Sequence, residues 1–170
     1  GEHAFLRPRA RDAPEHVHAA GRRRRAAAVD RAGRDRVAIE RDRASQALGI
    51  RIVRVAPGFA ELSMKVRGDM VNGHAICHGG LVFTLADSAF AFACNSYNFN
   101  TVAAGCTIEF LAPGREGDVL TAAARERAQG GRAGVYDIDV RNQDGRTIAL
   151  FRGKSMRIRG HVIAPDTKGE

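Results

Sequence analysis

Residues 78–97 read HGGLVFTLADSAFAFACNSY, and this stretch decides the fold. Within it, one stripe at helical spacing collects the polar side chains, while nearly every other position is apolar. The stripe consists of Thr84, Asp87, Ser88, Ala91 and Asn95. We therefore expect a helix over 79–97 that is enclosed on almost all sides. Its most apolar window, 81–94, is shorter than the roughly 20 residues that a membrane span needs and contains an acid, so we expect a buried helix and no membrane contact.

Segments typical of strands lie on both sides of this helix. Before it, residues 50–55 and 60–66 flank the turn Pro57-Gly58, which predicts a hairpin, and a short helix at 37–48 precedes them. After it come four further strand candidates separated by turn sequences, at 102–111, 119–128, 133–141 and 147–158. One early helix followed by consecutive hairpin-like strands predicts an α+β fold, in which a mostly antiparallel sheet packs on one central helix.

Several classes of protein are disfavoured by what the sequence lacks. It contains neither G-x-G-x-x-G nor a phosphate loop with its Lys, and it shows no βαβ alternation, so nucleotide chemistry of those kinds is not expected. Cys77, Cys94 and Cys106 form no C-x-x-C pair, and their odd number suits a reducing compartment. No apolar stretch follows the N-terminal arginines, so no secretory signal is expected. These features predict a cytoplasmic protein.

Length and charge are compatible with one folded domain and a basic extension. The chain has 170 residues, of which 44% are hydrophobic, and this is enough for a real core. Residues 1–40 contain 10 Arg and 6 acidic residues, whereas residues 41–170 contain 17 basic and 13 acidic residues, so each part carries +4 of the total of +8. The larger part is thus only mildly basic, as many enzymes with anionic ligands are.

Composition divides the chain into three parts. Residues 1–35 consist mainly of Ala, Arg, Gly, His, Asp and Pro, so we expect a disordered basic extension there, a folded domain over 36–160 and a flexible tail over 161–170. The run Arg22–Arg25 is compatible with a nucleic-acid arm, but no aromatic residues are interleaved with it and no recognition element follows. A solvated extension is therefore favoured, and no nucleic-acid partner is expected.

The chemistry of the chain concentrates around the apolar helix. An unpaired buried carboxylate is costly, so Asp87 is either satisfied by structural partners or used in a reaction. His78, Gly79 and Gly80 directly precede the helix, where glycines allow close approach of a ligand and free N–H groups favour an oxyanion. An oxyanion site followed two turns later by a carboxylate indicates acyl transfer.

Two other interpretations of this region are weaker. His78 could bind zinc, but only His74 and Cys77 lie nearby at ligand spacing, so no metal is expected. Ser88 could be a nucleophile beside Asp87, but adjacent helix residues point about 100° apart, so we favour a packing role for Ser88.

The run Asn72-Gly73-His74-Ala75-Ile76-Cys77-His78-Gly79-Gly80, with Asp87 nine residues after His78, resembles the signature of the hotdog-fold acyl-CoA thioesterases. Residues 87–96, 106–111, 134–138 and 149–155 are most similar to the members of that family that act in phenylacetic acid degradation. The resemblance covers residues 36 to 160, approximately, and leaves out the basic extension.

The resemblance implies a hotdog fold, in which a long central helix is wrapped by an antiparallel β-sheet. It also implies a homodimer with a continuous sheet and active sites at the subunit interface, often assembled as a dimer of dimers. The implied reaction is hydrolysis of phenylacetyl-CoA, or of similar (hydroxy)phenylacetyl thioesters, to the free acid and CoA. Coenzyme A is then part of the substrate, and no cofactor is required.

The resemblance also implies a role for each residue of the motif. Asp87 would be the catalytic carboxylate, acting as general base or nucleophile, and would face the motif of the other subunit. Gly79 would supply the oxyanion N–H, His78 would polarise the thioester carbonyl, and Asn72 would orient the attacking water. Some relatives hold that water with a Ser on the strand after the helix, but residues 102–105 read VAAG here, which leaves Thr107 or Thr84 as alternatives.

Further substrate contacts are expected from two kinds of residue. The phosphates of coenzyme A need cations or turn amides, for which the candidates are the turn Gly130-Gly131-Arg132 and, in the last strand, Arg152, Lys154 and Arg157. Gly80 is a further candidate for substrate binding. The aromatic candidates to line an aryl-acyl pocket are Phe83, Phe90, Tyr97 and Phe110, although residues at such spacings more often fill cores.

Two alternative functions remain open on the sequence. A hotdog-fold enoyl-CoA hydratase or dehydratase would use a His and an acid as paired proton carriers. A non-catalytic acyl-CoA sensor would bind DNA through Arg22–Arg25, with a salt-dependent affinity.

Overall fold

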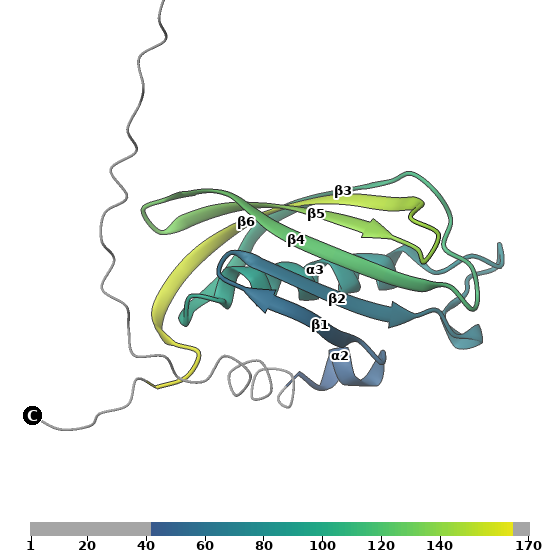
Figure 1. Ribbon diagram of the computed structural model, residues 1–170, viewed down its shortest axis with the longest axis horizontal. Coiled ribbons are helices and arrows are strands. Elements are labelled where there is room, and N and C mark those ends of the chain that lie inside the picture. Colours follow the sequence, from purple (N-terminus) through teal and green to yellow (C-terminus); the bar gives the residue numbers. More distant parts are fainter. Residues whose placement is uncertain (1–41, 165–170) are drawn as a thin grey trace, which may run out of the picture.

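The structure is a computed structural model that describes residues 42–164. The predicted extension at 1–35 lies outside the described residues, as do residues 165–170 of the predicted tail and the first part of the helix predicted at 37–48. Figure 1 shows a curved sheet that wraps around one side of a long helix. The expected α+β arrangement of a central helix and an antiparallel sheet is confirmed.

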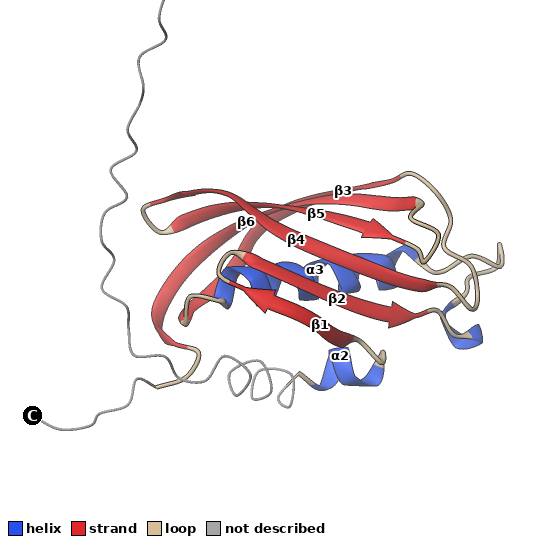
Figure 2. Ribbon diagram, in the orientation of Figure 1, coloured by secondary structure: helices blue, strands red, loops and turns tan. Residues whose placement is uncertain are grey.

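The described elements follow the order of the chain, as coloured in Figure 2. They are α2 (Arg43–Ala47), β1 (Arg51–Ala56), β2 (Phe59–Lys65), the 3-10 turn η1 (Gly68–Met70), α3 (Gly79–Asn95), β3 (Phe99–Phe110), β4 (Val119–Gly130), β5 (Ala133–Arg141) and β6 (Thr147–His161). The sheet order is β1-β2-β4-β5-β6-β3, and every pair of neighbours is antiparallel.

The strand order corrects one expectation. The predicted hairpin of β1 and β2 is present, and β4, β5 and β6 pair consecutively. However, β3 does not pair with β4, which follows it in the chain, but with β6 at the far edge. The chain crosses from β3 to β4, and β4 instead pairs with β2. The helix and strand segments were therefore predictable, whereas this crossover was not.

Element ends differ from the predicted ones for local reasons. Helix α3 ends at Asn95, two residues before the predicted end. The Asn95 side chain donates to the carbonyls of Ala91 and Thr101 and accepts from the Thr101 N–H, each at 2.9 Å, which turns the chain into β3. At the other end, β6 continues to His161, beyond the predicted boundary at 160.

The core lies between α3 and the inner face of the sheet. The side chain of Phe90 packs against Tyr136 and Phe151, with ring centroids at 5.4 and 6.1 Å. A Cβ atom on Gly153 would lie 2.9 Å from the Phe90 ring, so this strand position needs glycine for close helix packing. The core thus fixes the position of the helix on the sheet.

The sequence predicts that α3 is enclosed on almost all sides, but the structure buries only one face of it. Its buried residues form one broad face: Val82, Leu85, Ala86, Ala89, Phe90, Ala93 and Cys94. The predicted stripe is only half-buried at Asp87 and Ser88, and Ala91 is exposed. The difference arises because the sheet of one chain covers one side of the helix. No helix in the described range is both long and apolar enough to span a membrane.

The two edges of the sheet differ in length and character. Strand β1 has 6 residues, an irregularity between Ile52 and Arg54, and exposed arginines. Strand β3 has 12 residues, its residues from Val102 to Thr107 are all exposed, and Glu109 is its sole charged side chain. A long and nearly uncharged edge strand is a surface on which another strand can pair.

Candidate active site

The start of α3 leaves one backbone N–H free. His78 is the N-cap residue, and its Nδ1 atom accepts from the Gly80 N–H at 3.0 Å. The His78 N–H donates to the Met70 carbonyl, and the N–H groups of Leu81 and Val82 donate to the His78 carbonyl. Among the described residues, none accepts a hydrogen bond from the Gly79 N–H. The predicted oxyanion donor is therefore available, at the positive end of the helix dipole.

The same cap determines which ring nitrogen of His78 is the donor when the imidazole is neutral. Because Nδ1 is an acceptor, the neutral ring carries its proton on Nε2, which is thus a donor. The Gly80 N–H, by contrast, is used by the cap and is not free for substrate, so the predicted substrate contact of Gly80 is not available through its amide.

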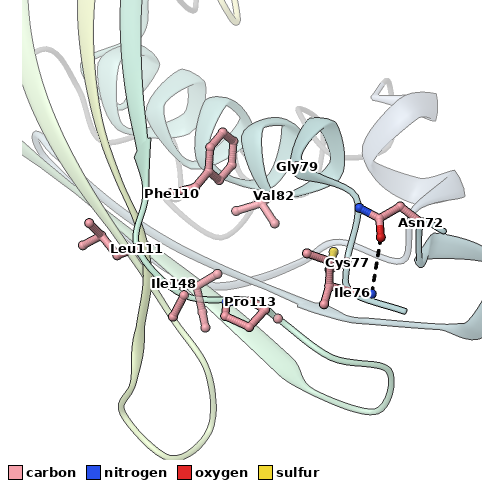
Figure 3. A pocket seen from close by; sticks show the side chains of 11 residues that line it. Asn72, Ile76, Cys77, Gly79, Val82, Phe110, Leu111, Pro113 and Ile148 are labelled. Carbon is pink, nitrogen blue, oxygen red and sulfur yellow. Dashed lines mark hydrogen bonds between the residues drawn. The ribbon is translucent and has the colours of Figure 1, made fainter. Parts of the chain in front are cut away.

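A cavity of about 420 Å³ opens beside Gly79 (Figure 3). Its lining is almost entirely apolar: Ile76, Cys77, Gly79, Val82, Phe110, Leu111, Ala112, Pro113, Gly114 and Ile148, together with Asn72. The Asn72 Oδ1 atom accepts from the N–H groups of His74 and Ile76 at 2.9 and 3.5 Å, which folds the turn before α3. This leaves the Asn72 amide NH₂ without a partner among the described residues.

Asp87 lies apart from this cavity in the same chain. It is half-buried, burial raises the pKa of its carboxyl above the ordinary value, and no described residue forms a hydrogen bond or ion pair with it. Eight residues of helix separate it from Gly79, or about 12 Å along the axis. The structure thus brings Asn72, His78 and Gly79 together but does not bring Asp87 to them.

A family model described as "Thioesterase superfamily" matches residues 74–149. The acyl-coenzyme A thioesterase PaaI of Escherichia coli (strain K12) is 54% identical over 123 residues, which are 72% of this chain and 88% of that relative. The chain belongs to the thioesterase superfamily.

Solved structures agree with this assignment. This thioesterase matches the structure of the E. coli PaaI protein from the phenylacetic acid degradation operon with a TM-score of 0.75 and 51% identity, covering 77% of this chain and 95% of the other. A hypothetical thioesterase with coenzyme A from Streptococcus pneumoniae TIGR4 matches with a TM-score of 0.63 and 27% identity, covering 66% and 88%. The expected hotdog fold is confirmed.

The predicted phosphate-binding cations of the thioesterase differ in their availability. The Arg152 guanidinium donates to both carboxylate oxygens of Asp137 at 2.6 and 2.9 Å, which holds the pKa of Asp137 below its ordinary value. Arg152 is therefore already paired. Lys154 is exposed and has no partner among the described residues. Arg132 Nε donates to the carbonyl of Arg157 at 3.0 Å.

These cations lie at different distances from the cavity within one chain. Arg157 is opposite Thr101 in the β3–β6 pairing, whereas Phe110 is opposite Ala149. Nine strand positions separate Thr101 from Phe110, or about 30 Å. Arg157 and its contact Arg132 therefore lie at the end of the sheet away from Phe110, whereas Arg152, opposite Thr107, lies only three strand positions from it.

Neither Thr84 nor Thr107, the two alternatives for holding the attacking water, directs its hydroxyl to the Gly79 N–H within one chain. The Thr84 hydroxyl donates to the Gly80 carbonyl of its own helix at 2.8 Å. Thr107 is opposite Arg152 in the sheet and shares its outer face, away from α3. The packing role favoured for Ser88 agrees with its contact, at 3.1 Å, to the buried Ser45 hydroxyl of α2.

Most of the cavity wall carries no signal in the sequence. Val82 lies on α3, Pro113 follows β3 and Ile148 lies on β6, so only the packing of these three segments places them around one space. No local pattern marks them as different from core residues. Among residues 42–164, no three His, Cys, Asp or Glu side chains cluster in a way that could hold a metal ion.

Proposed function

We propose that this thioesterase hydrolyses phenylacetyl-CoA and similar aryl-substituted acyl-CoA thioesters to the free acid and CoA. The observation that carries the proposal is the free Gly79 N–H at the start of α3, beside an apolar cavity. The 54% identity to an acyl-coenzyme A thioesterase supports the same substrate class.

In the proposed reaction, the Gly79 N–H and the His78 Nε2–H donate to the thioester oxygen. The donation stabilises the negative charge that develops on this oxygen when the carbonyl carbon is attacked. The cap on Nδ1 orients the imidazole, which keeps Nε2–H available as a donor. The apolar wall excludes water and strengthens both interactions.

Asp87 is the proposed base. Its carboxylate removes a proton from water, the resulting hydroxide adds to the carbonyl carbon, and the tetrahedral intermediate collapses as the C–S bond breaks. The CoA thiolate then takes up the proton that Asp87 accepted, and the acid loses its remaining proton to solvent and leaves as a carboxylate. Direct attack by Asp87 on the carbonyl carbon would instead break the C–S bond, releasing the thiolate and leaving an anhydride. Water would then hydrolyse the anhydride to the free acid and the Asp87 carboxylate, and the thiolate would take up a proton released in that hydrolysis. The raised pKa of Asp87 suits a proton acceptor, and neither route uses a cofactor.

A second copy of the chain completes the proposed site. Asp87 lies about 12 Å along the helix from Gly79, so another copy is needed to place a carboxylate beside the oxyanion donors. The open edge of β3 supports a homodimer that pairs β3 with its own copy into one continuous sheet. We extend the proposal to a dimer of dimers, as the family resemblance implies.

Antiparallel pairing of two β3 strands would also bring the cations of one subunit toward the cavity of the other. The end of β3 at Thr101 would then lie near the partner's opposite end. We propose that Arg132, Lys154 and, less directly, the paired Arg152 contact the phosphates of coenzyme A in this way. Free cysteines on the described chain support a reducing cytoplasm as the compartment.

Release of free CoA thiol from phenylacetyl-CoA tests the proposal. The wild-type protein should release the thiol, and folded Asp87→Asn should lose activity by about 10²- to 10⁴-fold, as expected for loss of a general base. Absence of thiol release from any aryl- or alkyl-CoA, with binding intact, would overturn hydrolysis. Water addition to an enoyl-CoA would then indicate a hydratase, and salt-dependent DNA binding through Arg22–Arg25 would indicate a sensor.

Mixing two inactive variants tests the shared site. Asp87→Asn and His78→Ala, exchanged into mixed dimers at equal ratio, should regain about a quarter of wild-type activity, because half the dimers are mixed and each has one complete site. A site contained in one chain would give no recovery on mixing.

A further inference from the structure

The ring of Phe110 lies directly on Gly79. A Cβ atom placed on Gly79 would be 3.2 Å from Phe110 Cζ and 3.4 Å from Cε1, so the ring occupies this position without crowding only because residue 79 has no side chain. Figure 3 shows the ring between β3 and the start of α3, above the cavity. The group with the free N–H and this aromatic ring therefore form one corner of the cavity.

The core does not hold Phe110 in place. Its side chain is 55% exposed, whereas Phe90 and Phe151 are 1% and 2% exposed. Phe110 is opposite Ala149, a small residue, on the face of the sheet that is directed toward α3. A half-exposed phenyl ring against a polar donor, in a cavity with apolar walls, is available for contact with a ligand.

We propose that Phe110 selects the acyl group, by packing its ring against the aryl ring of an arylacetyl thioester whose carbonyl oxygen is held at the Gly79 N–H. This inference rests on the proposed function. Aromatic pairs at centroid separations of about 4.5–7 Å are more favourable than their buried area alone suggests. A short alkyl acyl group, such as acetyl, does not extend beyond the corner and makes no such contact.

The contact with Gly79 predicts coupling between the two residues. Gly79→Ala keeps the backbone N–H, but its new Cβ would lie 3.2 Å from Phe110 Cζ, so the ring must shift by a few tenths of an ångström. The defect of Gly79→Ala should therefore be larger for phenylacetyl-CoA than for acetyl-CoA. A smaller, flexible side chain in Phe110→Leu should remove the clash, so the double variant should be less defective than the two single effects combined.

The test compares kcat/KM for phenylacetyl-CoA, hexanoyl-CoA and acetyl-CoA in the wild type, Phe110→Ala and Phe110→Leu. The preference for phenylacetyl-CoA over acetyl-CoA should fall about tenfold in Phe110→Ala, as expected from loss of an aromatic contact. The matched control is Val53→Ala, at an equally exposed apolar residue (56%) on β1, and it should keep the wild-type preference. Sedimentation shows whether each variant keeps the wild-type assembly, and Phe110→Leu serves if Phe110→Ala does not fold.

If kcat/KM of the Phe110 variants fell equally for all three substrates, or did not fall, the assignment of selectivity to Phe110 would be overturned. Failure of the wild type to release thiol from every substrate would instead overturn the proposed function. Additive effects of Gly79→Ala and Phe110→Leu would contradict the proposed contact between ring and oxyanion corner.

Discussion

At the scale of single residues, Asp87 has an environment that opposes its own charge. Burial raises its pKa, and no described group compensates with a hydrogen bond or an ion pair. The free-energy cost of burying an unpaired carboxylate is typical of catalytic residues, since a carboxylate with only a structural role is usually paired.

Asp87→Asn should therefore stabilise the protein at neutral pH while it removes activity. Because the pKa is raised on folding, the folded state binds the proton more tightly than the unfolded state. Wild-type stability relative to Asp87→Asn should decrease as pH rises from the ordinary Asp value through the raised pKa, and the difference should vanish in acid. Urea unfolding of both proteins between pH 4 and pH 8 measures this. A variant that is less stable than the wild type at pH 7 would contradict it.

Gly153 gives a residue-scale prediction about packing. Gly153→Ala should destabilise the protein by about 1–3 kcal/mol, because the added Cβ would lie 2.9 Å from a Phe90 ring that is itself held between Tyr136 and Phe151. Thermal unfolding measures the change. Gly130→Ala, where the added atom meets nothing within 4 Å, is the matched control and should change stability by about 0.5 kcal/mol or less.

The motif residues could be found from the sequence because their relation is local. His78, Gly79 and Asp87 lie on one helix and its cap, so their spacing alone predicts a donor and a carboxylate. The partner of the Gly80 N–H could not be predicted, because it depends on the rotamer of the His78 ring. The cavity wall depends on the pairing of strands that are distant in the chain.

At the scale of elements, the start of α3 combines a structural function and a proposed chemical function in one side chain. The His78 imidazole caps the helix through Nδ1 and offers a donor through Nε2. Different substitutions can separate these two functions.

His78→Asn should keep helix stability and lose activity, whereas His78→Ala should lose both. Asn is a good N-cap residue, and replacing a cap by Ala costs about 1 kcal/mol. Unfolding curves together with thiol release measure the two functions separately. If the His78→Asn variant supported wild-type turnover, the Nε2–H donor would not be needed.

The strands and helices were predictable to within a few residues because apolar periodicity and turn residues mark them. The position of β3 was not, since the middle of its sequence, residues 102–106, is small and apolar and does not distinguish a central from an edge strand. Its pairing with β6 follows from the crossover that passes from Leu111 to Asp118, which no local signal encodes.

At the scale of the whole molecule, the proposed dimer depends on the edge of β3. Ala104→Lys should weaken pairing of two β3 edges, because a charge near the centre of the strand would face its own copy in a twofold pair. The variant should sediment as a monomer and lose activity, as its Asp87 no longer meets a second set of donors. Val53→Lys, on the edge strand β1, is the control and should keep the wild-type assembly. A monomeric wild-type protein with full activity would overturn both expectations.

The difference between the two edges of the sheet limits the size of the assembly that edge-to-edge strand pairing can form. A sheet with two receptive edges can add copies without limit, and the product is a fibre. In this molecule β1 is short and carries exposed arginines, so it is a poor acceptor, and growth can proceed from β3 alone. Once two β3 strands meet, both receptive edges are consumed, and the assembly terminates itself at a finite size.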